Sequence, residues 1–108
     1  MYPAPFEYHA PSSIQEAIAL LSRHGQDAKL LAGSQSLVPL MKLRLAQPAH
    51  VIDLRKIAAL TGIQDQGGVL HVGALTTHVN MAKSELVRKK LPMVAEAANL
   101  IGDAQVRN

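Results

Sequence analysis

The 108-residue sequence contains no cysteine and no tryptophan, and aromatic residues make up only 3% of it. Without cysteine, the chain can form no disulfide, no thiolate zinc site and no iron–sulfur cluster of its own. No apolar run approaches the roughly 20 residues that a bilayer-spanning helix requires. The N-terminal residues Pro3, Pro5, Glu7 and His9 do not form a signal peptide. We therefore expect a cytoplasmic protein without a membrane span.

Basic residues exceed acidic ones and give a formal net charge of +3. A nucleic-acid surface would interleave basic and aromatic residues. The one tight basic run, Arg88–Lys90, lacks such neighbours, so no nucleic-acid partner is expected. The histidines show no metal-ligand spacing such as H-x-x-x-H, so no metal site is predicted. No Ser/His/Asp constellation can be argued from spacing alone, so no catalytic residue is predicted. The five histidines are His9, His24, His50, His71 and His78.

The first 27 residues predict one helix. Ser13 and Glu16 match a capping box, apolar residues recur at helical spacing, and Gly25 provides a stop. We expect this helix over residues 13–24.

Two short strands are predicted next. Ala28–Ala32 is predicted to be a buried strand, and Val51–Leu54 is the next strand candidate. Between them, Pro39 favours a helical turn or an irregular segment over a central strand, because proline cannot donate to a ladder. If the strands share a sheet with this segment as the crossover, the unit is a compact α/β layer. Asp53 is interpreted as a structural carboxylate at a strand end.

Small and polar residues follow the first predicted strand. Glycine can adopt positive φ and let the backbone approach a ligand, while serine hydroxyls add donors. Backbone N–H groups at such a turn can cradle a diphosphate. An ordinary strand-ending turn is the alternative. Lys42 and Arg44 fit either phosphate neutralisation or a solvated surface. The candidate loop consists of Ala32, Gly33, Ser34, Gln35, Ser36 and Leu37.

The second half of the chain predicts a hairpin and two helices. Gly67-Gly68 lies between the apolar runs 63–66 and 69–72, which is a hairpin signal. Thr76 or Thr77 is placed to cap a short helix.

Pro92 is a typical first helical residue, and the helix that it begins is expected to close at Gly102. No element is predicted for the polar tail, residues 103–108.

Four parts of the chain carry a family resemblance. Phe6–Pro11 with Glu16–Leu21 is similar to an F-x-Y-x-x-P entry and an E-A-x-x-L-L helix. Residues 32–46, followed by Val51–Leu54, are similar to A-G-G-Q/H-S-L, P-x-M-K-x-R-L-A and I-D-L motifs. Residues 72–78 and 102–108 are similar to I-G-A-x-T-T and D-x-Q-V-R-N. Together they resemble the FAD-binding medium subunit of molybdenum hydroxylases of the carbon monoxide dehydrogenase and xanthine dehydrogenase type.

The resemblance implies a fold, a cofactor and a binding site. The fold is α/β (α+β), as the N-terminal part of the vanillyl-alcohol-oxidase-like (PCMH-type) FAD-binding fold. The loop Ala32–Leu37 would hold the FAD diphosphate, and Thr76, Thr77 and Arg107 would also lie at the FAD site. Ser34 stands where the family usually has a second glycine, which would strain the loop by about 1–2 kcal/mol if that position needs positive φ.

The resemblance also implies a larger assembly. Residues 1–55 would be an α/β subdomain with the first diphosphate loop, and residues 56–108 the truncated start of a second subdomain. A second glycine loop would follow Asn108, so this chain alone is expected to bind FAD weakly and to be inactive. In the complete subunit, FAD would pass electrons from a 2Fe–2S small subunit, supplied by a molybdopterin-containing large subunit, to a terminal acceptor. The alternatives are a nucleotide-binding module or a subunit-assembly module without flavin.

Overall fold

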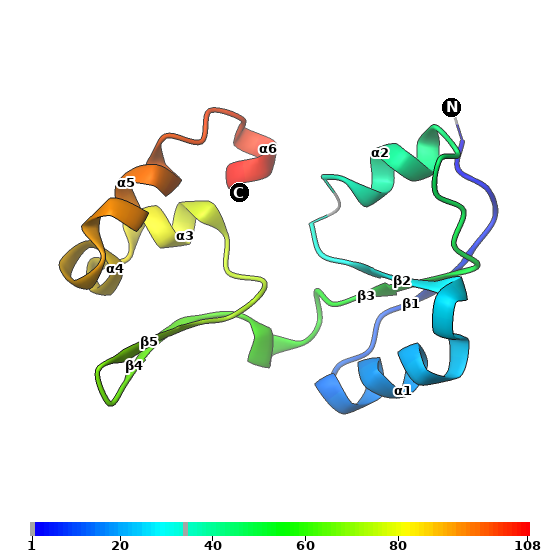
Figure 1. The fold of residues 1–108 in the computed structure, drawn as a ribbon, viewed down its shortest axis with the longest axis horizontal. Coiled ribbons are helices and arrows are strands. Elements are labelled where there is room, and N and C mark those ends of the chain that lie inside the picture. Colours follow the sequence, from blue (N-terminus) through cyan, green and yellow to red (C-terminus); the bar gives the residue numbers. More distant parts are fainter. Residues whose placement is uncertain (1, 34) are drawn as a thin grey trace. The chain divides into compact units, whose positions relative to one another are not determined.

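The computed structural model describes residues 2–33 and 35–108, without the side chain of Arg107 (Figure 1). The chain divides into two compact units, Met1–Ala59 and Leu60–Asn108. No helix within the described residues is both long enough and apolar enough to cross a membrane.

The first unit contains a three-stranded parallel sheet in the order β1-β3-β2. Its strands are β1 (Glu7–His9), β2 (Ala28–Leu31) and β3 (His50–Asp53). The two predicted strands are confirmed within one residue, and they pair in parallel as the crossover required. Strand β1 was not predicted, because three residues with two polar side chains give almost no periodic signal.

Two helices cover opposite faces of this sheet, as Figure 1 shows. Helix α1 (Ile14–His24) begins after Ser13, whose Oγ accepts from the Glu16 N–H at 3.1 Å. The Glu16 carboxylate in turn accepts from the Ser12 N–H at 3.0 Å. Helix α2 (Leu37–Lys42) contains Pro39 in its first turn, where a missing N–H costs nothing. Both helical predictions are confirmed.

Buried side chains lie on both faces of β3. Val51 is 1% exposed and Ile52 is 0% exposed. Because side chains alternate along a strand, Val51 lies on the α2 face and Ile52 on the α1 face. The prediction that β2 is buried is correct only at Ala28. Leu30 is 44% exposed, because β2 is an edge strand and β3 occupies the centre.

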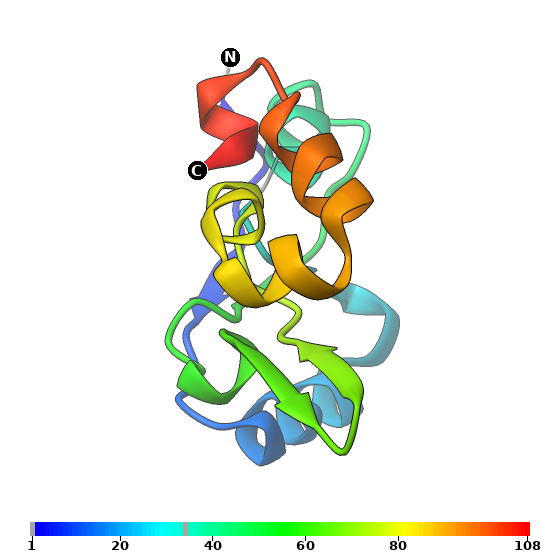
Figure 2. The ribbon, with the colours of Figure 1, turned by 90° about the vertical axis from the view of Figure 1, so that its left-hand side faces the viewer.

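The second unit begins with the antiparallel hairpin of β4 (Ile63–Gln66) and β5 (Val69–Val72). Figure 2 shows the two strands and their tight turn. Gly67 and Gly68 have φ of +61° and +83°, as a turn that matches strand twist requires. The predicted hairpin is confirmed residue for residue.

Four helices follow the hairpin: α3 (His78–Lys83), α4 (Glu85–Lys90), α5 (Pro92–Asn99) and α6 (Ala104–Arg107). Their shared core uses small or β-branched side chains, which allow close helix packing: Ala82, Val87, Ala95 and Ala98.

The predictions for these helices were only partly correct. Helix α5 begins at Pro92 as predicted, but it ends at Asn99, before Gly102. Helix α4 was missed although Ser84 caps it, because its six residues include only two apolar side chains and so give little periodic signal. No element was predicted in the tail, which forms α6, since the Asp103 carboxylate accepts from the N–H groups of Gln105 and Val106.

Gly73 directly follows β5 and pairs with the backbone segment that precedes β4. Its N–H donates to the Gly62 carbonyl at 2.8 Å, and the Leu75 N–H donates to the Leu60 carbonyl at 2.8 Å. A Cβ at Gly73 would lie 2.3 Å from the Leu60 carbonyl oxygen. Only glycine allows this close approach of two backbone segments.

We predict that Gly73→Ala destabilises the second unit by about 1–3 kcal/mol, because the added methyl group forces the Leu60 backbone away. The measurement is denaturant unfolding of the protein. Gly102→Ala is the matched control, since a Cβ there has no atom within 4 Å. Equal stability of the two variants would contradict the prediction.

Candidate functional site

The loop after β2 lies at the carboxyl edge of the parallel sheet. In open α/β sheets, ligands bind outside the carboxyl ends of the strands. Gly33 has a φ of +75°, and nothing lies within 4 Å of the position where its Cβ would be. The Gln35 side-chain amide donates to the Gly33 carbonyl at 3.5 Å. Ala32, Gly33, Gln35 and Ser36 are all exposed.

The loop residues fit a diphosphate. With Gly33 in the left-handed region and, among the described residues beyond its chain neighbours, no atom near the position of its Cβ, a phosphate oxygen can approach the backbone N–H groups. Ser36 precedes α2, yet its hydroxyl makes no capping bond with that helix. Leu37 begins α2. Five of the six predicted loop residues therefore lie together, and Ser34 lies outside the described residues.

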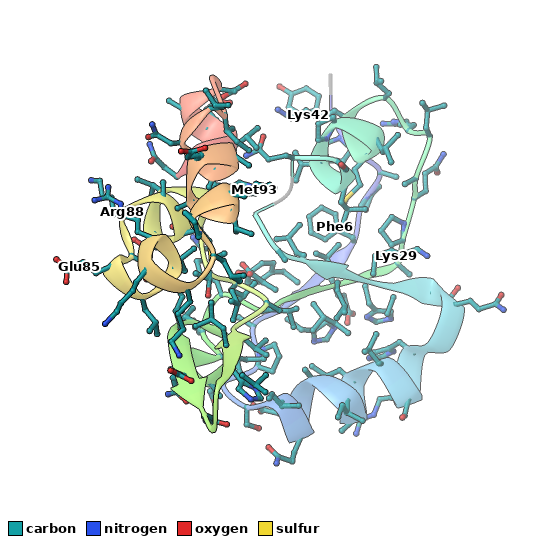
Figure 3. All side chains as sticks on the ribbon, turned by 60° about the vertical axis from the view of Figure 1, so that its left-hand side comes forward. Phe6, Lys29, Lys42, Glu85, Arg88 and Met93 are labelled. Carbon is teal, nitrogen blue, oxygen red and sulfur yellow. The ribbon has the colours of Figure 1, made fainter. Side chains whose placement is uncertain are left out.

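An apolar pocket of about 180 Å³ lies beneath α2. Figure 3 shows Phe6 and Lys42, which line it together with Val38 and Met41. The pocket suits an apolar group and not an anion, so phosphate is expected at the loop. Arg44 points elsewhere, since its Nε donates to the Tyr2 carbonyl at 3.3 Å.

Beside the loop, Asp53 ends β3 and is 5% exposed. It is paired in register with Leu31, and the Leu54 N–H donates to the Leu31 carbonyl at 3.1 Å. The Tyr8 hydroxyl donates to Asp53 Oδ2 at 2.5 Å. The Arg55 N–H donates to Oδ1 at 3.0 Å, and its guanidinium donates to Oδ2 at 3.2 Å.

The pKa of Asp53 lies below its ordinary value of 3.8. Burial, the largest single cause, raises the pKa, but the hydrogen bonds from Tyr8 and Arg55 together outweigh it. Asp53 therefore stays ionised and ties β1 to β3, which is the structural role expected of it. The contribution of Tyr8 was missed, because no sequence signal connects residues 45 positions apart.

The other predicted site residues belong to the second unit. The Thr76 hydroxyl accepts from the Gly62 N–H at 3.1 Å and donates to the Gly62 carbonyl at 3.2 Å. The Thr77 hydroxyl accepts from the Asn80 N–H at 3.2 Å and so caps α3, as predicted for one of the two threonines. Arg107 is the last residue of α6. The structure describes these residues within their own unit.

Sequence reasoning also missed a cluster of three histidines, His9, His24 and His50. They come from β1, α1 and β3, so no spacing motif could reveal them. The pKa of His24 is lowered by burial first, and then by its neighbours His50 and His9.

Residues 4–108 match the model of the family described as the FAD binding domain in molybdopterin dehydrogenase. The chain belongs to this family of FAD-binding domains. Its cofactor is FAD, in agreement with the open Gly33 loop, and the resemblance noted in the sequence is confirmed.

Two relatives of this FAD-binding domain are carbon monoxide dehydrogenase medium chains. The one from Hydrogenophaga pseudoflava is 54% identical over 108 residues, which is 100% of this chain and 38% of that protein. The one from Afipia carboxidovorans is 47% identical over 107 residues, which is 99% of this chain and 37% of that protein. The chain thus spans well under half the length of these relatives.

Solved structures share the fold of this FAD-binding domain. Carbon monoxide dehydrogenase from Hydrogenophaga pseudoflava superposes on the whole chain, and on 38% of its own chain, with a TM-score of 0.95. Quinoline 2-oxidoreductase from Pseudomonas putida 86 is 37% identical and has a TM-score of 0.92, over 100% of this chain and 38% of its own. The fold is the predicted mixed α/β fold of PCMH-type FAD-binding domains.

We predict that Tyr8→Phe lowers stability by about 1–2 kcal/mol at pH 7, because Asp53 loses a hydrogen bond to its charged form. Since the pKa of Asp53 is depressed in the folded protein, this stabilisation is present above pH 3.8 and is lost as the pH falls through the lower folded value. The measurement is urea unfolding of the complete subunit between pH 7 and pH 3. Tyr2→Phe is the control, since Tyr2 is 85% exposed. This account would be refuted if the wild type exceeded Tyr8→Phe in free energy of unfolding by the same amount at pH 3 as at pH 7.

Proposed function

We propose that this chain is part of the FAD-binding medium subunit of a molybdenum hydroxylase, and that residues 32–37 hold the FAD diphosphate. The observation that carries this proposal is Gly33, which is exposed, has a φ of +75° and lies at the carboxyl edge of the parallel sheet. The family membership supports FAD as the ligand.

Each loop residue has a distinct part in this proposal. Gly33 allows the close approach, and the N–H groups of the loop donate to phosphate oxygens. Ser36 adds its hydroxyl, which α2 does not use as a cap. Ala32 has a small side chain that leaves room for the phosphate. The Gln35 side-chain amide holds the Gly33 carbonyl by a hydrogen bond, and Leu37 fixes the end of the loop because it is the first residue of α2. Ser34 is assigned to the diphosphate loop only because of its position in the motif formed by residues 32–37.

The family motifs are the ground for proposing that Thr76, Thr77 and Arg107 of the second unit also contact FAD. The Thr77 hydroxyl accepts a bond within α3 and retains its hydrogen for donation to FAD. The Thr76 hydroxyl already both donates and accepts, so Thr76 would act by holding the segment in place. Arg107 would contribute a cation that suits a diphosphate. Residues 1–55 would then form the first FAD subdomain, and residues 56–108 the start of the second.

In the complete protein, this subunit would work in a cytoplasmic hetero-oligomer with a molybdopterin-containing large subunit and a 2Fe–2S small subunit. FAD, when bound, supplies the redox chemistry by passing electrons from the iron–sulfur clusters to a terminal acceptor. These 108 residues contain no cysteine, which fits a division in which the partner supplies the cluster ligands. The residues described above bind and orient the cofactor.

The alternative of an assembly module without flavin gains no support from the basic run. Arg88 Nε donates to the Ala82 carbonyl at 2.9 Å, and Lys90 forms an ion pair with Asp65. Two of the three basic side chains in this run thus already make interactions within the second unit, which weakens the case for the run as a docking surface.

We predict that Gly33→Asp weakens FAD binding by the complete subunit about 100-fold or more, because a carboxylate facing a diphosphate costs several kcal/mol. The measurement is titration of the flavin-free subunit with FAD, followed by flavin fluorescence.

The matched control is Gly67→Asp, because Gly67 also has positive φ and open space around it but lies in the β4–β5 turn. It should bind FAD like the wild type. Equal affinity of the two variants would overturn the placement of the diphosphate. A wild-type subunit that binds ADP but not FAD would instead support the nucleotide-binding alternative.

A further inference from the structure

Three histidines from separate elements meet on the α1 face of the first unit. His9 ends β1, His24 ends α1 and His50 begins β3. The parallel register places Glu7 opposite His50, so Glu7, His9 and His50 project from the same face. Helix α2, to which the FAD loop leads, covers the other face (Figure 1). The cluster is therefore separate from the proposed diphosphate site.

The nitrogen atoms of the cluster are spaced like metal ligands. His9 Nε2 lies 3.1 Å from His50 Nδ1, so the two nitrogens face each other and share at most one proton. Two imidazole nitrogens on a tetrahedral zinc ion at 2.0–2.1 Å would be about 3.3 Å apart. One nitrogen from each of the three rings lies within 4.8 Å of the others. For all three nitrogens to bind one ion, the stacked rings of His24 and His50 would have to turn so that their in-plane lone pairs converge.

The imidazole rings of the three histidines pack against one another. The centroids of His24 and His50 are 3.5 Å apart with an interplanar angle of 16°, and His9 lies 5.4 Å from His24. Neutral imidazole is the form that binds a metal ion.

A carboxylate and a route from solvent complete the arrangement. Glu7 Oε2 lies 3.5 Å from His50 Nδ1 and 3.9 Å from His9 Nε2. The side chains of His50 and His9 are 19% and 22% exposed, so an ion can reach them. A surface pocket of about 350 Å³, lined in part by His9, Glu16 and Arg23, opens beside the cluster.

We propose that His9, His24 and His50 bind one divalent transition-metal ion, zinc, with the Glu7 carboxylate as the fourth ligand. Three imidazoles and one carboxylate, without any thiolate, form a donor set that suits tetrahedral zinc. The ion would tie the end of α1 to β1 and β3.

The test uses the complete subunit, purified without a polyhistidine tag and freed of metal. It is dialysed against zinc, and bound zinc is measured by elemental analysis. We expect one zinc ion per subunit. Zinc should bind His24→Gln at least tenfold more weakly, because loss of a residue that only hydrogen-bonds a metal ligand already lowers metal affinity about tenfold or more, and loss of the ligand itself should lower it at least as much. Zinc should also raise the melting temperature of the wild type more than that of His24→Gln.

The matched control is His71→Gln, since His71 is exposed on β5 and outside the cluster. It should bind zinc like the wild type. Cobalt(II) added to the wild type should give the intense visible absorption of a tetrahedral site, a readout that needs no variant. The proposal fails if the wild type retains no stoichiometric zinc, or if His24→Gln and His71→Gln bind it equally well.

Discussion

The first unit depends on the burial of β3 between two parallel neighbours and two helices. Val51 and Ile52 are almost completely buried, one on each face of the strand. Burying each of these side chains contributes about 1.5–3 kcal/mol to the stability of the fold, and this burial keeps β3 at the centre of the sheet. Because β1 and β2 both pair with it in parallel, the carboxyl ends of β2 and β3 meet at one edge. That edge exposes the Gly33 loop next to Asp53.

The alternation of side chains along β3 gives its two faces different chemistry. Toward α2, Asp53 receives hydrogen bonds from Tyr8 and Arg55 and stays ionised although it is buried. Toward α1, His50 meets His9 across the strand pair. One short strand thus positions the edge that carries the proposed FAD loop and, on the opposite face, the histidine cluster. A register shift of one residue would exchange the two sets of side chains.

Local signals predicted much of the secondary structure. The Ser13–Glu16 capping box, the Gly67-Gly68 turn and the proline at the start of α5 each act within a few residues, and all three were identified correctly. Strand β1 is too short for its periodicity to be seen, and α6 depends on a single cap at Asp103. The exposure of β2 could not be predicted either, since it follows from the position of the strand in the sheet.

The sequence by itself determined the local elements, the Gly33 loop as the candidate diphosphate site, and the family through motifs that extend over the whole chain. Only the tertiary structure decided that β3 is central, that Asp53 is held by Tyr8, and that three histidines come together. The physical reason is the separation along the sequence of the residues that interact. Caps and turns depend on residues three or four positions apart, whereas His9 and His50, 41 positions apart, meet only through strand pairing.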